Sequence, residues 1–226
     1  MYRYLMLLLA LTVSTATWAQ QAPDYTKRGD SDPKAKAILK KLRTKYNGYN
    51  SLQADFKLLI EDGDDTYKQS GKMWQRGEQY RLELDDNEIV SDGTTLWVYM
   101  KQNDQIQITD AEAEEDDPES LSPKKLLSLY ESDEFVFAYA GERKRQGKVY
   151  QYIEFKPLDR DSEYYKVRLT VDKAAQLPYQ IKVFSRDGSR YTMTLERMTP
   201  NPEIAGNKFT FDTTKYPNAL VEDLRL

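Results

Sequence analysis

The sequence contains no cysteine and no histidine among its 226 residues. These two absences exclude disulfides, Cys- or His-ligated zinc and haem, thiol nucleophiles, Ser-His-Asp triads and histidine general bases. A Cys-linked acyl anchor is excluded for the same reason. The chemistry that remains is carboxylate or lysine catalysis, calcium binding, or binding without catalysis.

The chain also lacks a basic excess and a long apolar run. Its formal net charge is −4, so its composition is not that of a nucleic-acid-binding protein. No segment after the first twenty residues approaches the length of a membrane span. What is present is 39% hydrophobic and 31% charged residues, a balance typical of one soluble domain.

Residues 1–19 have the pattern of a secretory signal peptide. Arg3 supplies the positive start, and residues 5–13 form an apolar run that is too short for a membrane-spanning helix. Thr17 and Ala19 place small residues at positions −3 and −1, so we expect cleavage after Ala19. The leader therefore predicts export of a soluble protein, to the periplasm in a Gram-negative cell.

The remaining chain is expected to form a flexible lead-in over residues 20–32 and a single domain over residues 33–226. Asp32 and Pro33 form a helix start, and apolar residues at helical spacing continue to Tyr46 before Gly48 stops the helix. Ser122 and Pro123 begin a second, short helix. The seven acids of residues 110–119 are interpreted as a solvated loop.

Between and after these helices, apolar residues recur with period two, which predicts short strands. Asp-Gly pairs at 62–63, 92–93 and 187–188 indicate tight turns. The fold class is therefore mostly β with helices (α+β), and most neighbouring strands are antiparallel. A sheet of about eleven strands is expected, drawn from twelve strand-like segments at residues 53–60, 66–75, 79–84, 88–91, 95–100, 105–109, 135–140, 149–156, 164–171, 179–185, 190–197 and 208–211.

A meander of this length curls into a barrel, a half-barrel or a sandwich, and the concave face of an unclosed sheet offers a place for the helices. The large apolar residues on one face of the strands favour an ordinary core on pattern alone, and they are also compatible with a cavity for a lipid-like ligand. The alternation does not separate these two interpretations.

The other motifs in the sequence give weaker evidence of function. The sequences that begin at Ser31 and Ser122 match S-x-x-K, but no S-D-N or K-T-G accompanies them, and both lie at helix starts. The acids of residues 62–65 fit a hairpin turn better than a calcium loop. None of these motifs singles out a catalytic residue, a metal site or a cofactor site, and a carboxylate-based hydrolase site among the 37 acids stays an alternative.

Four ordered segments resemble the family of periplasmic outer-membrane lipoprotein carriers, LolA. The most specific is the S-D-G-x-x-L-W-x-Y stretch at residues 91–99, which follows the related segment 72–84. The others are S-L-Q-A-D-F at 51–56, S-P-K-K-L-L at 122–127 and the closing F-T-F at 209–211. Together they extend the resemblance over about residues 33–215.

The resemblance implies an unclosed antiparallel half-barrel covered by a helical lid, and no catalysis. It implies a soluble, monomeric carrier that shields the acyl chains of lipoproteins while they move from the inner to the outer membrane. The implied partners are acylated lipoproteins, an ATP-driven (ABC) inner-membrane transporter that extracts them and, where one exists, an outer-membrane acceptor. The same half-barrel used for another lipid or a glycolipid stays an alternative.

The resemblance also assigns residues. Arg76 falls on the family's arginine that latches the lid, and a guanidinium suits that role because its donors form a fixed fork. The proline after that arginine is Gly77 here, and the C-terminal stretch also departs from the family pattern. The implied acyl cavity is lined by Phe56, Tyr80, Leu82, Leu84, Leu96 and Trp97, and the implied lid carries Leu126, Leu127 and Tyr130.

Overall fold

A computed structural model describes residues 28–112 and 134–225. These residues contain one α-helix, α1 (Pro33–Asn47), and three short 3₁₀ helices, η1 (Arg28–Asp30), η3 (Gly206–Phe209) and η4 (Thr213–Lys215). None of the helices in these ranges is long and apolar enough to cross a membrane. The strands are β1 (Leu52–Asp62), β2 (Asp65–Arg76), β3 (Gln79–Leu84), β4 (Asn87–Ser91), β5 (Thr95–Met100), β6 (Gln105–Asp110), β7 (Phe135–Arg145), β8 (Lys148–Pro157), β9 (Tyr164–Asp172), β10 (Leu177–Ser185), β11 (Arg190–Pro200) and β12 (Leu220–Asp223).

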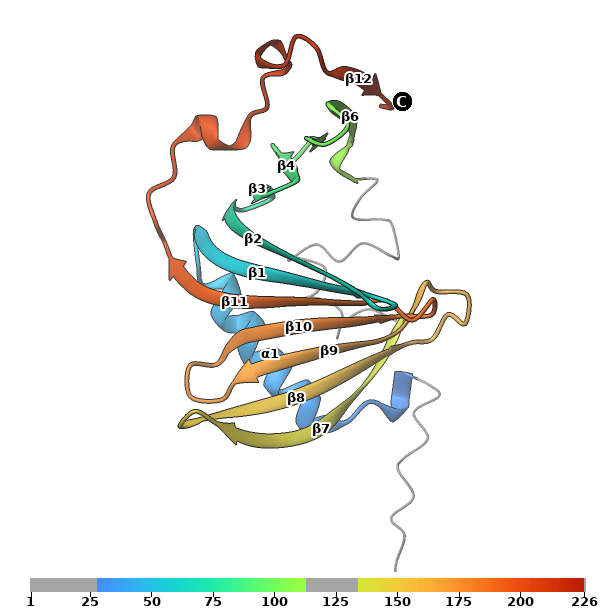
Figure 1. Ribbon diagram of the computed structural model, residues 1–226. Coiled ribbons are helices and arrows are strands. Elements are labelled where there is room, and N and C mark those ends of the chain that lie inside the picture. The colour runs from blue at the N-terminus through green and yellow to red at the C-terminus, as the bar shows by residue number, and fades with distance from the viewer. Residues whose placement is uncertain (1–27, 113–133, 226) are drawn as a thin grey trace, which may run out of the picture.

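All twelve strands belong to one sheet that is not closed into a barrel (Figure 1). The strand order is β12-β6-β5-β4-β3-β2-β1-β11-β10-β9-β8-β7, so β12 and β7 form its two edges. Neighbours pair antiparallel except β12, which runs parallel to β6. The pairing of β1 with β11 joins the early strands to the late ones. The predicted fold class, an unclosed and mostly antiparallel sheet with helix, is confirmed.

The helix α1 begins and ends where the sequence indicates. The Asp32 carboxylate accepts a hydrogen bond from the Lys34 N–H at 2.7 Å, and Pro33 occupies the first helical position. The Gly48 N–H donates to the carbonyl of Lys45 at the other end. Asp32 also accepts from the Tyr139 N–H on β7, which fixes the start of the helix on the edge strand.

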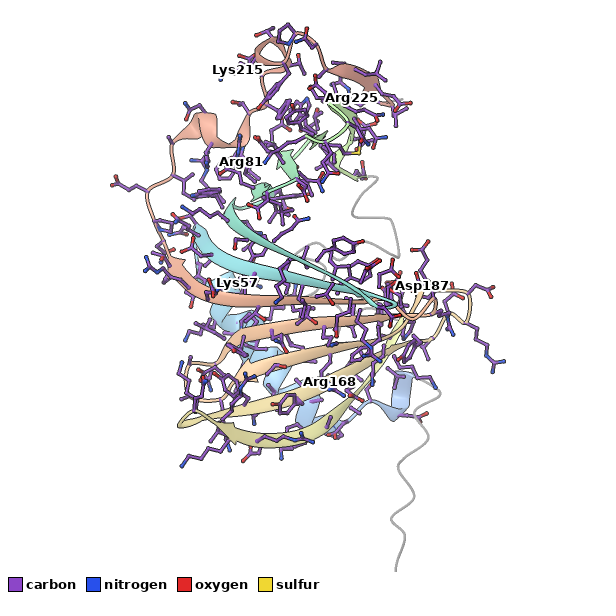
Figure 2. All side chains as sticks on the ribbon, in the orientation of Figure 1. Lys57, Arg81, Arg168, Asp187, Lys215 and Arg225 are labelled. Atoms are coloured by element: carbon purple, nitrogen blue, oxygen red, sulfur yellow. The ribbon has the colours of Figure 1, made fainter. Side chains whose placement is uncertain are left out.

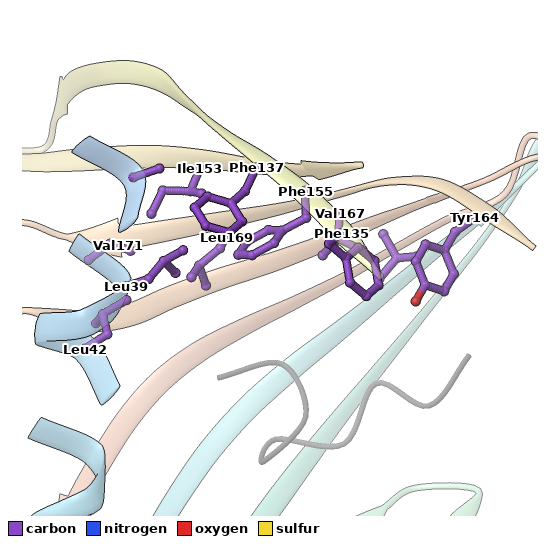
Figure 3. Packing of buried hydrophobic residues seen from close by; sticks show 12 residues of the cluster. Leu39, Leu42, Phe135, Phe137, Ile153, Phe155, Tyr164, Val167, Leu169 and Val171 are labelled. Carbon is purple, nitrogen blue, oxygen red and sulfur yellow. The ribbon is translucent and has the colours of Figure 1, made fainter. Parts of the chain in front are cut away.

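The main core lies between α1 and strands β7 to β10 (Figure 3). Ala35, Leu39 and Leu42 form the buried stripe of the helix and pack on alternate residues of these strands. Figure 3 shows Leu39 and Leu42 directed at Leu169 and Val171 of β9. We call the side of the sheet that carries α1 the inner face and the opposite side the outer face.

Two features at the C-terminal end differ from the predicted elements. Residues 208–211 were expected to form a strand, but η3 covers Gly206–Phe209 instead, and Phe209 is fully buried. The strand prediction there is wrong because one deeply buried aromatic side chain in a 3₁₀ turn imitates alternation. The edge strand β12 was not expected, because all four of its residues are exposed and carry no inward pattern. The predicted helix after Ser122 lies outside the described residues.

Candidate functional site

The candidate site is the inner face of strands β1 to β5, beyond the end of α1. Antiparallel partners point to the same side of a sheet, so the register assigns each side chain to a face. Gly71 pairs with Phe56 and with Leu84, Met73 pairs with Leu82, and Ser91 pairs with both Tyr80 and Leu96. The register therefore brings five of the six predicted cavity residues to the inner face: Phe56, Tyr80, Leu82, Leu84 and Leu96.

The sixth predicted cavity residue, Trp97, lies on the outer face. It follows Leu96 directly on β5, and successive side chains on a strand point to opposite sides. Its indole stacks on Phe211 of the C-terminal segment at a ring distance of 6.5 Å. Trp97 therefore does not line the surface that carries Leu82.

The predicted latch, Arg76, also lies on the outer face. Its guanidinium donates to the Ile204 carbonyl at 3.2 Å and to the Gln79 side chain at 3.0 Å, and it lies 4.9 Å from the centre of the Phe209 ring. These contacts attach the C-terminal segment to the sheet. The predicted lid residues Leu126, Leu127 and Tyr130 lie outside the described residues, so the latch role stays a prediction.

The inner face of β1 to β3 carries an apolar cluster that is less well covered than the main core. Four members are buried, namely Leu52, Ala54, Phe56 and Met73. The residues packed against them are only partly buried: Tyr46, Tyr49, Leu82, Leu84, Met193, Leu195 and Met198. The main core, by contrast, has twelve buried members and only three that are partly buried. The inner face is thus tightly packed beneath α1 and remains accessible beside it.

A glycine shapes the floor of this surface. The ring of Phe56 lies directly over Gly71 on β2, and a Cβ atom at position 71 would overlap it. A glycine inside a strand often marks such a close approach. Phe56 can therefore lie flat against β2 and leave the space above it to its apolar neighbours.

Polar groups border the cluster at the end of α1. A recess of about 190 Å³ is lined there by residues that include Tyr46, Tyr49, Asn50 and Gln75. The Tyr46 hydroxyl donates to the Gln75 side chain. Burial raises the pKa of Tyr46 to about 12; its hydrogen bond to Gln75 opposes this rise and the Glu78 carboxylate adds to it.

The raised pKa of Tyr46 predicts a loss of stability at alkaline pH. The folded protein keeps the phenol protonated, whereas the unfolded chain releases the proton above the usual pKa of 10.0, so unfolding is favoured as pH rises. We expect this group to lower the free energy of unfolding by about 1 kcal/mol between pH 8 and pH 11. Urea titrations should show that Tyr46→Phe removes this decrease, and Tyr67→Phe, at an exposed phenol, serves as control. An unchanged decrease in Tyr46→Phe would contradict the prediction.

A charged network around Arg81, which is labelled in Figure 2, holds the outer face of β3 and β4 to the C-terminal segment. Arg81 forms ion pairs with Glu83 and Glu88 and donates to the Lys208 carbonyl at 3.1 Å. Burial of Glu83 opposes its ionisation, but hydrogen bonds and charges of Lys208 and Arg81 outweigh it and lower its pKa. The outer face of β3 to β5 is therefore covered by the C-terminal segment. The inner face of these strands remains as the candidate binding surface.

Sequence reasoning missed several members of the inner surface. Met73, Ile89 and Val98 lie on it by register, while Met193 and Leu195, which belong to an apolar face that the alternation of residues 190–197 indicates, pack against it from β11. The alternation within each strand was a usable signal. What was missing was the pairing of β1 with β11, two strands more than one hundred residues apart in the sequence.

Comparison with known families gives one match over most of the chain. The family model described as "Outer membrane lipoprotein carrier protein LolA" matches residues 47–212. The matched range contains strands β1 to β11, including the inner face of β1 to β5 described above.

Comparison with individual proteins gives more distant similarities. An uncharacterized protein of Methanocaldococcus jannaschii is 25% identical over 93% of this chain, which spans 58% of the length of that relative. The crystal structure of an uncharacterized conserved protein from Thermus thermophilus has a TM-score of 0.55 at 12% identity, covering 84% of this chain and 99% of that one. A LolA superfamily protein from Nitrosomonas europaea has a TM-score of 0.41 at 15% identity, covering 79% and 98%. At these identities the structural likeness concerns the fold alone.

Proposed function

Since the chain belongs to the LolA family of outer membrane lipoprotein carrier proteins, we propose that it is a periplasmic carrier of acylated lipoproteins. In this proposal the acyl chains lie on the inner face of β1 to β5, and the protein moves them from the inner to the outer membrane without catalysis. It receives them from an ATP-driven inner-membrane transporter and delivers them to an outer-membrane acceptor.

The observation that carries the proposal is the incomplete burial of the apolar cluster on the inner face. Leu82 and Leu84 on β3 and Met193 and Leu195 on β11 are partly buried and pack against the buried cluster of β1 and β2, the two strands between them. A buried methylene contributes about 0.8 kcal/mol, so these side chains would be stabilised by any aliphatic chain that covers them. The same value explains why a multiply acylated protein does not leave a bilayer unless another apolar surface accepts its chains.

Five of the six residues predicted to line the acyl cavity remain candidates for that role. Phe56, Tyr80, Leu82, Leu84 and Leu96 share the inner face and are proposed to contact acyl chains. Trp97 is left out, because it stacks on Phe211 on the outer face. Among the described residues no three acids gather to hold a metal ion, and the proposal requires neither a metal nor a cofactor.

The direct test is native mass spectrometry on protein that has been exported to the periplasm and purified without detergent. Co-purified triacylated lipoproteins are the expected result. Free lipid or glycolipid instead would assign the same surface to a different cargo and overturn the carrier role. If the protein carries no apolar ligand and binds no added fatty acid, the inner face is an ordinary core and the proposal is wrong.

A further inference from the structure

The outward surface of α1 has an unusual charge composition. The helix carries six cations, Lys34, Lys36, Lys40, Lys41, Arg43 and Lys45, and no acid. Lys36 and Lys40, like Lys41 and Lys45, are four residues apart on the helix, a spacing at which like charges destabilise. The apolar stripe of α1 is buried in the main core, and the exposed Lys36, Lys40 and Lys41 lie around the side that faces away from the sheet.

The hairpin between β7 and β8 adds to this positive charge. Arg143, Lys144, Arg145 and Lys148 are exposed at its tip. Lys34 lies 3.7 Å from the centre of the Tyr139 ring on β7, and Lys45 donates to the Ala175 carbonyl in the turn after β9. That turn is attached to β8 by a hydrogen bond of 3.0 Å from the Lys173 N–H to the Val149 carbonyl.

These contacts place the cations of the helix and of the hairpin at one end of the sheet, where Figure 1 shows the β7–β8 hairpin beside the β9–β10 turn. We call the cations of α1 and the hairpin tip 143–148 together the basic face. The acids beside it are already engaged: Asp32 caps the start of α1, and Glu142 and Asp172 pair with Lys173 and Lys148. Within the part of the chain that the structure describes, no carboxylate forms an ion pair with Lys36, Lys40, Lys41, Lys144 or Arg145.

The basic face contrasts with the rest of the molecule, because the whole chain has a net charge of −4. Such a charge asymmetry orients a protein in front of an acidic surface, so that the basic side approaches first. The lysines on α1 that form no ion pair with a described residue lower helix stability, so an anionic partner that neutralises them would stabilise the helix.

The composition of the basic face distinguishes a membrane from a protein partner. Protein interfaces are centred on aromatic side chains and arginine, and they are depleted of lysine. The large exposed hydrophobic residues of the described chain all lie outside α1 and the hairpin tip. A diffuse, lysine-rich surface without an apolar anchor fits a layer of anionic headgroups, each basic residue near such a surface contributing about 1 kcal/mol.

We propose that the basic face docks the protein on anionic phospholipid bilayers through headgroup contacts, without insertion. This inference goes beyond the proposed acyl binding, which uses the inner face of β1 to β5. A protein docked through α1 would hold that inner surface next to the bilayer, because Tyr46 and Tyr49 connect the end of the helix to the apolar cluster.

The experiment is a vesicle flotation assay on residues 20–226, the chain expected after removal of the leader. The vesicles contain phosphatidylcholine alone or with about one part in three of phosphatidylglycerol. The test variant is Lys36→Gln/Lys40→Gln/Lys41→Gln, since glutamine retains helix propensity. The matched control is Lys68→Gln/Lys72→Gln/Lys215→Gln, which changes the net charge equally at exposed residues away from the basic face.

We expect the wild-type protein and the control to bind only the anionic vesicles, and binding to fall steeply with salt. The test variant should bind roughly a hundredfold more weakly, at about 1 kcal/mol for each lysine. Equal binding by test and control variants would overturn the proposal. So would wild-type binding to soluble polyglutamate but not to vesicles, which would assign the face to an acidic protein. Fatty-acid binding, measured in parallel, should be unchanged in both variants, so failure of the docking proposal is distinguishable from failure of the carrier proposal.

Discussion

Leu82→Glu is expected to abolish binding of a fluorescent fatty acid while the protein remains folded. Leu82 lies at the middle of the inner surface, between Met73 on β2 and Ile89 on β4 in register. An ionised carboxylate there would have to lose its hydration against the acyl chain, and its register neighbours Met73 and Ile89 offer no charge to compensate it. The affinity for the probe should fall by about a hundredfold or more, as a titration followed by fluorescence would show.

The control for this prediction is the same substitution on the other face. Leu59 on β1 points outward, since it pairs with Lys68 and with Thr192. A glutamate at position 59 would lie beside the Lys68 ammonium and outside the acyl surface. Leu59→Glu should therefore retain probe binding. Because Leu82 is only partly buried, the circular dichroism spectrum and melting of Leu82→Glu should stay close to those of the wild type. Undiminished probe binding by a folded Leu82→Glu protein would show that the inner face is not the acyl site.

The sheet was predictable because its signals are local. Most strands from β1 to β11 have apolar residues at alternate positions, and the Asp-Gly pairs at 62–63, 92–93 and 187–188 connect strands that are neighbours in the sheet. Hairpin pairing needs only a turn and two matching patterns. The boundaries of α1 were predictable for a similar reason, since a capping carboxylate and a proline act within one turn.

The assignment of Trp97 shows where such reasoning stops. Alternation states that Leu96 and Trp97 face opposite sides, but it does not state which one faces inward. That choice depends on the pairing of β5 with β4 and, through the intervening strands, with β1. Since the outer face of these strands is also buried, by the C-terminal segment, apolar character occurs on both sides and the simple rule of one apolar face fails. The face of the sheet on which Arg76 lies was not predictable for the same reason.

The largest effect on stability is expected at Phe56. Its ring is buried, with 2% of its surface exposed, and it contacts both the apolar cluster and the backbone of Gly71. Phe56→Ala removes those contacts and leaves a cavity between β1 and β2. We expect it to lower the free energy of unfolding by about 3–5 kcal/mol, measured by urea denaturation.

A second substitution decides whether the ring's close approach to Gly71 is the cause. Gly71→Ala alone should destabilise the protein by about 1–3 kcal/mol, because the new Cβ overlaps the Phe56 ring and forces it away. In the Phe56→Ala background the overlap is gone, and alanine is favoured over glycine in a strand by about 0.5–1 kcal/mol. Gly71→Ala should then stabilise, so its effect changes sign and the double-mutant cycle gives a coupling energy of about 2 kcal/mol. Additive effects would mean that the ring does not rest on position 71. A change of sign would show that this glycine is required for Phe56 to form the floor of the inner surface, and Gly71→Ala should then also weaken fatty-acid binding, because the displaced ring would occupy the space proposed for the acyl chain.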